Sequence, residues 1–241
     1  MNQDDHHHHM MVHSHRDVAG GTARAVIFGI SDGLVSNVAL ILGVAAATSE
    51  GSGVVVAGVA GLLAGAASMA AGEYVSVKAQ VELIERELAI ERDSIASKPK
   101  LETQELASIY RRRGVSAEHA HVIATAVMAD PEVALEVHAR EELGIDPDSG
   151  GGNPVAAAAG SFVAFSVGAA LPLLPWFITS GVAGMVASVI IGLVAAGAVG
   201  VTLAWFTERS WIRTAIRQIS LAAGACALTW VIGSLVGSAL V

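Results

Sequence analysis

The longest stretch of the chain without a charged residue covers residues 149–207 and reads SGGGNPVAAAAGSFVAFSVGAALPLLPWFITSGVAGMVASVIIGLVAAGAVGVTLAWFT. About 20 apolar residues cross the hydrocarbon core of a bilayer as a helix, so these 59 residues are long enough for two spans. Pro172, Pro175 and residues 179–181 mark the expected turn between them. The stretch therefore predicts two membrane-spanning helices, at residues 155–174 and 180–205.

Three more apolar segments lie outside this stretch, each with at most one charged residue: 25–47, 53–76 and 217–240. The chain has 26 glycines, and only 5% of its residues are aromatic. Small residues let membrane helices pack closely where lipid provides no hydrophobic drive. The one cysteine, Cys226, excludes a disulfide framework. The sequence predicts an all-α integral membrane protein with five transmembrane helices, two within residues 24–77 and three within residues 149–241.

Basic residues predict the orientation of these spans. All 14 Lys and Arg residues lie before the first span, in an insert at residues 78–148, or in the loop around Arg209 and Arg213. Five spans place these three regions on one side of the membrane, and the positive-inside rule makes that side cytoplasmic. The C-terminus is then outside. The brevity and composition of the chain favour a bacterial inner membrane, and its net charge of −8 argues against nucleic acid as a partner.

The N-terminal segment, residues 1–23, is polar and rich in histidine. Six of the nine histidines of the chain fall within it: His6, His7, His8, His9, His13 and His15. The run fits a native metal-catching tail or the remnant of an expression tag. Neither interpretation changes the predicted fold.

The insert, residues 78–148, is predicted to be a cytoplasmic helical domain. Residues 77–95 contain no Pro or Gly, so we expect the second span to continue as a helix into the cytosol until Pro99 interrupts it. A second helix is expected over residues 101–113. Ser116 and Asp130 are typical helix N-caps and predict two further helix starts, the last helix ending near Gly144.

Asp32 is an ionisable residue inside the first span. A charge at membrane depth costs roughly 2.5–3.5 kcal/mol on insertion scales, so it normally faces a polar cavity, a cation or a proton path. Ser36 and Asn37 make the same region polar and favour a lined cavity. The alternative is a carboxylate near the interface that only reaches toward water.

Met69 lies in the second span, eight residues after Gly61. A thioether combined with a carboxylate such as Asp32 suits Fe²⁺ or another borderline transition ion. Filling space in the protein interior is an equally good interpretation of a single methionine. Gly61 and Gly65 form a GxxxG pair, for which helix packing is the usual role. Glu73, near the cytoplasmic end, fits a pore mouth or an ordinary interfacial charge.

Carboxylates of the insert recur at helical spacings of three and four, which places both members of a pair on one helix face. The pairs are Glu82/Glu85, Glu87/Glu91, Glu102/Glu105 and Glu132/Glu136, followed by Glu141 and Glu142. Clustered carboxylates repel unless a cation lies between them. A solvated acidic face is the alternative. His119, His121 and His138 are possible further ligands, although a surface histidine is the commoner case.

Two stretches carry a resemblance to a known family. Asp32-Gly33-Leu34-Val35-Ser36-Asn37 lies in the first span, and Gly65-Ala66-Ala67-Ser68-Met69-Ala70-Ala71-Gly72-Glu73-Tyr74 ends the second. Together with the five-span layout and the acidic insert, they resemble the vacuolar iron transporter family over nearly the whole chain from about residue 20.

The resemblance implies a homodimer that exports Fe²⁺, and often Mn²⁺, from the cytosol in exchange for protons. It implies a pathway at the dimer interface that is lined by Asp32 and Met69 of both subunits. It also implies that the insert binds metal, for which Zn²⁺ or Co²⁺ could substitute. The insert ligands that it indicates are Glu91, Glu102, Glu105 and Glu142, with Glu136 and His138 near further ligand positions.

Four positions depart from the pattern of the family. Gly61 stands where such transporters carry a glutamate, and Ser94 replaces one glutamate of the insert. His138 and Ala139 stand where the family has methionines. These differences bear on how many ions the protein holds, on its preference between Fe²⁺ and Mn²⁺, and on how transport is coupled to protons.

The function predicted from the sequence is therefore proton-coupled export of divalent metal, with no permanently bound cofactor. One alternative is a membrane-anchored metal sensor or store, which binds metal without moving it. A second is a proton-coupled carrier of a small organic solute, which would not need the acidic insert. An enzyme is not expected, because neither a nucleophile–base pair nor a phosphate-binding glycine loop is evident.

Overall fold

A computed structural model of the chain describes residues 21–48, 51–147 and 150–240, and the histidine run at the N-terminus lies outside them. The described residues form α-helices and one 3-10 helix, joined by short turns and without a strand among them. This confirms the all-α class. The elements are α1 (Gly21–Ala47), α2 (Gly51–Ser97), α3 (Pro99–Arg112), α4 (Ala117–Val127), α5 (Pro131–Glu141), α6 (Pro154–Leu173), η2 (Leu174–Phe177), α7 (Gly181–Thr207) and α8 (Trp211–Leu240).

Five of these helices are long and apolar enough to cross a membrane: α1, α2, α6, α7 and α8. The five predicted spans are therefore confirmed. The largest difference is at α8, which begins at Trp211, six residues before the predicted start. Its first turns carry Arg213 and Arg217, whose charges end an apolar segment but not a helix. A long basic side chain at a helix end reaches the membrane surface while its backbone stays helical.

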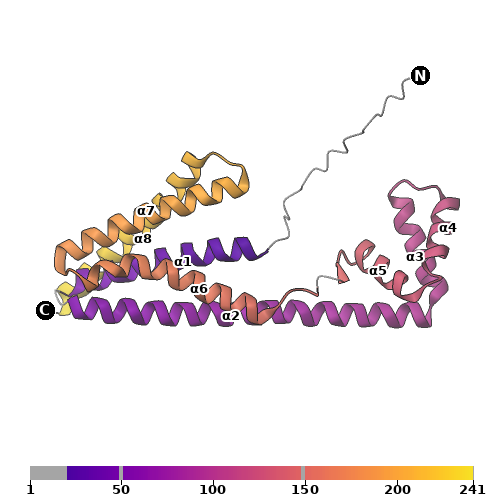
Figure 1. Cartoon of the computed structure of the whole chain (residues 1–241), viewed down its shortest axis with the longest axis horizontal. Coiled ribbons are helices and arrows are strands. Elements are labelled where there is room, and N and C mark those ends of the chain that lie inside the picture. Colours follow the sequence, from indigo (N-terminus) through magenta and orange to yellow (C-terminus); the bar gives the residue numbers. More distant parts are fainter. Residues whose placement is uncertain (1–20, 49–50, 148–149, 241) are drawn as a thin grey trace, which may run out of the picture.

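Helix α2 runs along the whole length of the molecule (Figure 1). Its 47 residues correspond to about 70 Å, more than twice the hydrocarbon thickness of a bilayer. The N-terminal half packs in the bundle of apolar helices, and the C-terminal half carries the charged residues to α3, α4 and α5. The prediction that the second span continues beyond the membrane is confirmed.

Helix α1 lies at the centre of the bundle, packed against α6 and α8 and also against α2 and α7. Small residues make this packing possible. A Cβ on Gly168 of α6 would overlap the carbonyl oxygen of Ile30, and a Cβ on Gly33 would overlap the carbonyl oxygen of Phe165. The helix backbones of α1 and α6 are therefore in direct contact, as in other membrane bundles that depend on glycine.

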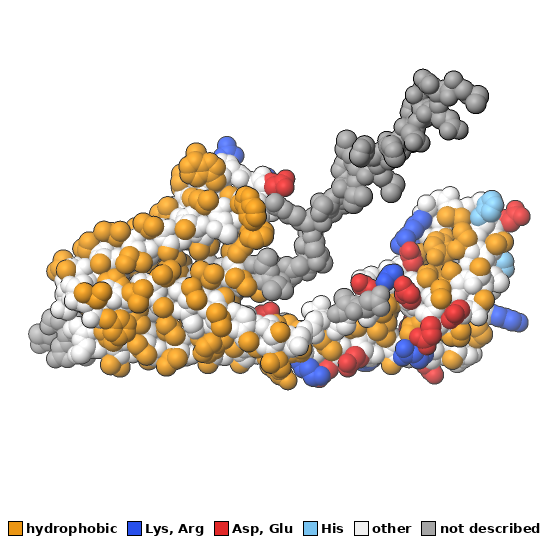
Figure 2. All heavy atoms as spheres, in the orientation of Figure 1, with side chains coloured by type: hydrophobic (Ala, Val, Ile, Leu, Met, Phe, Trp, Pro, Cys, Tyr) orange, Lys and Arg blue, Asp and Glu red, His pale blue; other side chains and the backbone are white. Residues whose placement is uncertain are grey.

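Some buried polar groups of the bundle are bonded to one another. The Trp176 indole N–H donates to the Ser188 hydroxyl over 2.8 Å, and that hydroxyl donates to the carbonyl oxygen of Pro172 over 2.6 Å. This chain of bonds ties η2 and the end of α6 to α7. Figure 2 shows apolar side chains over the surface of the bundle and charged side chains gathered on the insert. That division matches a bundle in lipid and an insert in water.

Helices α4 and α5 begin where the sequence predicts, whereas α3 begins at Pro99, two residues before its predicted start. The side chain of Ser116 accepts from the His119 N–H at the start of α4, and Asp130 accepts from two backbone N–H groups at the start of α5. Helices α3 and α4 pack through Leu106 and Ala120. Helix α5 packs against the far end of α2, where a cluster contains Ile95, Ala134 and Leu135. This contact brings α5 beside the acidic residues of α2.

Candidate metal sites

A cavity of about 340 Å³ opens on the side of the bundle between α1 and α2. Asp32, Ser36 and Asn37 line it from α1, and Met69 lines it from α2. The structure thus brings together four of the five residues predicted for a transport pathway. Glu73, the fifth, is half-buried on α2 and is not part of the lining. The other lining residues are Phe28, Leu40, Gly61, Gly65, Ser68 and Phe165.

The two glycines of the GxxxG pair shape the wall of this cavity. A Cβ on Gly65 would overlap the ring of Phe165, and a Cβ on Gly61 would overlap the end of the Leu40 side chain. The structure therefore shows the packing role expected for the pair: Gly65 packs against α6, and Gly61 packs against α1. Close packing at these two positions also brings the Met69 turn of α2 to the Asp32 turn of α1.

Among the described residues that line the cavity, Asp32 is the only one with an ionisable side chain. It lies inside the first span, seven residues beyond Ala25 in an apolar segment of 23 residues that ends at Ala47. No described residue forms an ion pair with it, and it is exposed on the open side of the cavity. The Ser36 hydroxyl donates to the Asp32 backbone carbonyl over 2.6 Å. A carboxylate, a hydroxyl and a thioether thus face one hollow, which is a ligand set for a divalent cation.

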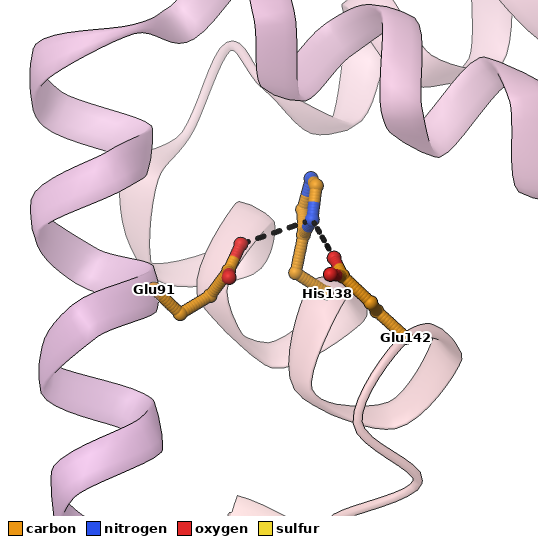
Figure 3. A group of neighbouring side chains, drawn as sticks. All are labelled: Glu91, His138 and Glu142. Atoms are coloured by element: carbon orange, nitrogen blue, oxygen red, sulfur yellow. Dashed lines mark hydrogen bonds and ion pairs between the residues drawn. The ribbon is translucent and has the colours of Figure 1, made fainter.

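A second group of possible ligands lies in the insert (Figure 3). His138 Nδ1 of α5 is 3.1 Å from Glu91 Oε1 of α2 and 3.4 Å from Glu142 Oε2, just beyond α5. In Figure 3 the two carboxylates point from opposite sides toward the imidazole ring. Ligand atoms of the three residues lie within 4.8 Å of one another, so one ion could contact all of them.

Burial gives this group the electrostatics of a cation site. Glu91 and Glu102 are less than one-tenth exposed, and His138 is fully buried. Burial raises the pKa of Glu102 above its usual 4.5, and the neighbouring Glu105 and Glu142 raise it further, while His138 lowers it. Four carboxylates therefore share one region with one histidine. A bound cation would compensate the repulsion between the carboxylates and favour their ionised form, so that protons leave the carboxyl groups.

Other candidates lie outside this group. Glu136 pairs with Arg140 over 2.7 Å, one turn along the exposed face of α5. Glu141 pairs with Arg113. The Nδ1 of His119 lies 2.8 Å from the hydroxyl of its own helix cap, Ser116, and His121 is exposed. The structure brings together Glu91, His138 and Glu142, places Glu102 and Glu105 near enough to interact with Glu91 electrostatically, and leaves Glu136 paired with Arg140.

Some lining residues of the membrane cavity could not be predicted from the sequence. Phe165 comes from the third span and reaches the cavity because its ring packs on Gly65. Nothing in its own sequence context marks it. Ser68, next to Met69, could have been found as a polar residue beside a candidate ligand.

The fold and these two sites define a class: a five-span helical membrane protein with a carboxylate–thioether cavity in its bundle and a carboxylate–histidine group in a helical insert. Comparisons with known proteins make the class specific. The chain belongs to the VIT family, whose family model matches residues 23–234. This confirms the resemblance found in the sequence.

Several relatives match over most of their length. Vacuolar iron transporter 1 of Eucalyptus grandis is 33% identical over 214 residues, which cover 87% of this chain and 84% of the relative. Vacuolar iron transporter 1 of Arabidopsis thaliana is 32% identical, covering 90% and 87%. A vacuolar iron transporter of Acanthamoeba castellanii is 36% identical, covering 92% and 82%. The chain is thus a member of a family of membrane transporters for metal ions.

Proposed function

We propose that the protein exports Fe²⁺, and also Mn²⁺, from the cytosol through a pore between two copies of the chain, in exchange for protons. One observation carries the proposal: Asp32 and Met69 face the same cavity, within the membrane-spanning part of the bundle and on its open side. The names of the relatives support iron as a substrate. The charge pattern supports a cytosolic insert and N-terminus, and the brevity of the chain fits a bacterial inner membrane.

The open side of the cavity supports a homodimer. An exposed carboxylate inside the span would face lipid in a single chain, which is unfavourable by several kcal/mol. A second copy related by a two-fold axis would close the cavity and supply its own Asp32 and Met69. Two carboxylates then balance the charge of one divalent ion. The two thioethers favour a borderline ion such as Fe²⁺ over Ca²⁺ and Mg²⁺, which prefer oxygen alone.

The insert is proposed to collect metal before transport. Glu91 lies 22 residues beyond Met69 on the same uninterrupted helix, a distance of about 33 Å. Glu73 lies one turn beyond Met69 toward the insert and is proposed as a group of the pore mouth. No step of this route changes the ion chemically.

Proton coupling is proposed to reside on Asp32. A carboxylate binds a proton or a cation through the same oxygens, so a proton that arrives from the outer side releases the ion there. The side chains of Met69, Ser36 and the other lining residues do not gain or lose a proton near neutral pH. Asp32 is thus the one group of the cavity lining whose charge protons can change.

Flux separates this proposal from a metal store or sensor, which the buried group around His138 would also support. The purified chain is reconstituted into vesicles that contain a metal-quenched dye, and Fe²⁺ is added outside under reducing conditions. The proposal requires quenching of the dye inside. A store binds Fe²⁺ at the insert and leaves the dye unchanged.

Cross-linking tests the dimer pore. In a Cys226→Ala background, Ser68→Cys places a single thiol in the cavity lining. We expect a short thiol-specific cross-linker to give covalent dimers in the membrane, because the two cavities face one another. Val194→Cys, on the exposed face of α7, is the matched control and should stay monomeric on denaturing gels. Equal yields for the two positions, or none for Ser68→Cys, would contradict the dimer pore.

Metal binding at the insert is expected to stabilise the protein and to depend on pH. Burial raises the pKa of Glu102, so its ionised form destabilises the metal-free insert as the pH rises above 4.5, and metal reverses this effect. Because the pKa of Glu102 is raised, protons compete with metal for this carboxylate at a higher pH than they do for an ordinary glutamate. We expect Mn²⁺ to raise the thermal midpoint of the full chain more at about pH 7 than at about pH 5.

Two substitutions make this measurement specific. Glu91→Gln should weaken Mn²⁺ binding roughly 10- to 100-fold and remove most of the shift. Glu136→Gln is the matched change on an exposed carboxylate that pairs with Arg140, and it should keep the full shift. Equal losses in both variants would mean that the group around His138 is not the site.

A further inference from the structure

One buried polar atom in the wall of the membrane cavity has no partner. Asn37 is 2% exposed, and its side-chain Oδ1 accepts no hydrogen bond. A buried amide oxygen without a partner costs about 1–3 kcal/mol. The hydroxyls of Ser161 and Ser166 in α6 are also buried without a partner, but of these three groups only Asn37 lines the cavity that contains Asp32.

The orientation of the Asn37 amide is fixed by its other end. Nδ2 donates to the carbonyl oxygen of Ala169 on α6 over 2.6 Å, and a carbonyl can only accept, so the amide nitrogen must lie on that side. Oδ1 is thereby turned toward α2, where a Cβ added to Gly61 would lie 3.1 Å from it. Both Asn37 and Gly61 line the cavity that contains Asp32 and Met69.

We propose that Oδ1 of Asn37 is a neutral oxygen ligand of the transported divalent cation, and that Gly61 is small so that this oxygen can reach the ion. The proposal rests on the proposed transport function and adds a ligand to it. The flexible end of Leu40 lies against the same point of Gly61 and rotates aside when the ion enters. The ion then supplies the partner that Oδ1 lacks.

The chemistry explains why an amide occupies this position. A carboxylate at position 37 would place an oxygen against the Ala169 carbonyl, whereas the amide donates there and still offers an oxygen to the cavity. The amide also adds a ligand without adding charge. When Asp32 takes up a proton, only neutral ligands remain around the ion, which favours its release.

The test compares two changes with one control in proteoliposomes, from initial rates of Fe²⁺ and Mn²⁺ uptake against concentration. Asn37→Leu removes the oxygen at similar volume, and Gly61→Ala covers it without removing it. Ser161→Ala is the control, because its hydroxyl is equally buried and unpartnered in α6 but lies outside the cavity lining.

We expect Asn37→Leu to raise the KM for metal roughly tenfold or more, the effect of losing one group at a metal site. Gly61→Ala should raise the KM in the same direction, and Ser161→Ala should change it less than about twofold. An unchanged KM in Asn37→Leu would overturn the ligand assignment while transport by the unmodified chain still stands. Absence of flux in the unmodified chain would refute the proposed function itself. If Asn37→Leu does not fold, an unchanged KM in Gly61→Ala overturns the proposal.

Discussion

Asp32→Asn is expected to reduce metal flux about 30-fold or more. The substitution keeps the size of the side chain and removes the only charge of the cavity lining. Loss of the charged partner of a desolvated cation costs on the order of 2–5 kcal/mol, which converts to a loss of that size. Initial rates of Fe²⁺ uptake into proteoliposomes, at equal amounts of reconstituted protein, measure the effect.

The matched control is Glu82→Gln, the same change of carboxylate to amide on the exposed part of α2, where Glu82 pairs with Lys78 over 3.4 Å. This exposed pair lies outside both candidate sites, so the flux of Glu82→Gln should equal that of the unmodified chain. Undiminished transport by Asp32→Asn would remove Asp32 from the pathway and with it the proposed coupling of metal to protons.

Gly168→Val is expected to prevent stable assembly of the bundle. Its Cβ would overlap the backbone carbonyl oxygen of Ile30, and a backbone atom cannot move aside as a side chain does. Helices α1 and α6 would have to separate along their contact, destabilising the protein by about 3 kcal/mol or more. The yield of monodisperse protein and its thermal midpoint in detergent should both fall sharply.

Gly160→Ala is the matched control for this prediction. Gly160 lies in the same helix, and a Cβ added there meets no atom within 4 Å. Replacing a glycine by alanine at an open helical position stabilises by roughly 0.5–1 kcal/mol. A Gly168→Val protein as stable as Gly160→Ala would show that α1 and α6 do not contact one another as described.

The sequence predicted the fold well because the features that determine it are local. An uncharged stretch of 59 residues has no soluble alternative, and the caps at Ser116 and Asp130 act within one turn of their helices. The start of α8 was predicted six residues too late. There the change from apolar to charged residues marks the membrane surface, and the helix continues past it.

The candidate sites depend on contacts between helices, which spacing cannot give. Glu132/Glu136 and Glu102/Glu105 have equivalent helical spacings, yet Glu102 is buried near His138 while Glu136 pairs with Arg140. Only the packing of α5 on α2 decides between them. The free oxygen of Asn37 likewise depends on the Ala169 carbonyl, 132 residues away in the chain.

The most direct test of the central claim measures metal and protons in the same vesicles. Proteoliposomes with an acidic lumen and dyes for both ions are given Fe²⁺ outside, with protein-free vesicles as the control. The account predicts that Fe²⁺ enters while protons leave, and that collapse of the pH gradient slows the entry of metal. Fe²⁺ bound by the protein without any rise of metal inside, or metal entry without proton movement, would contradict it.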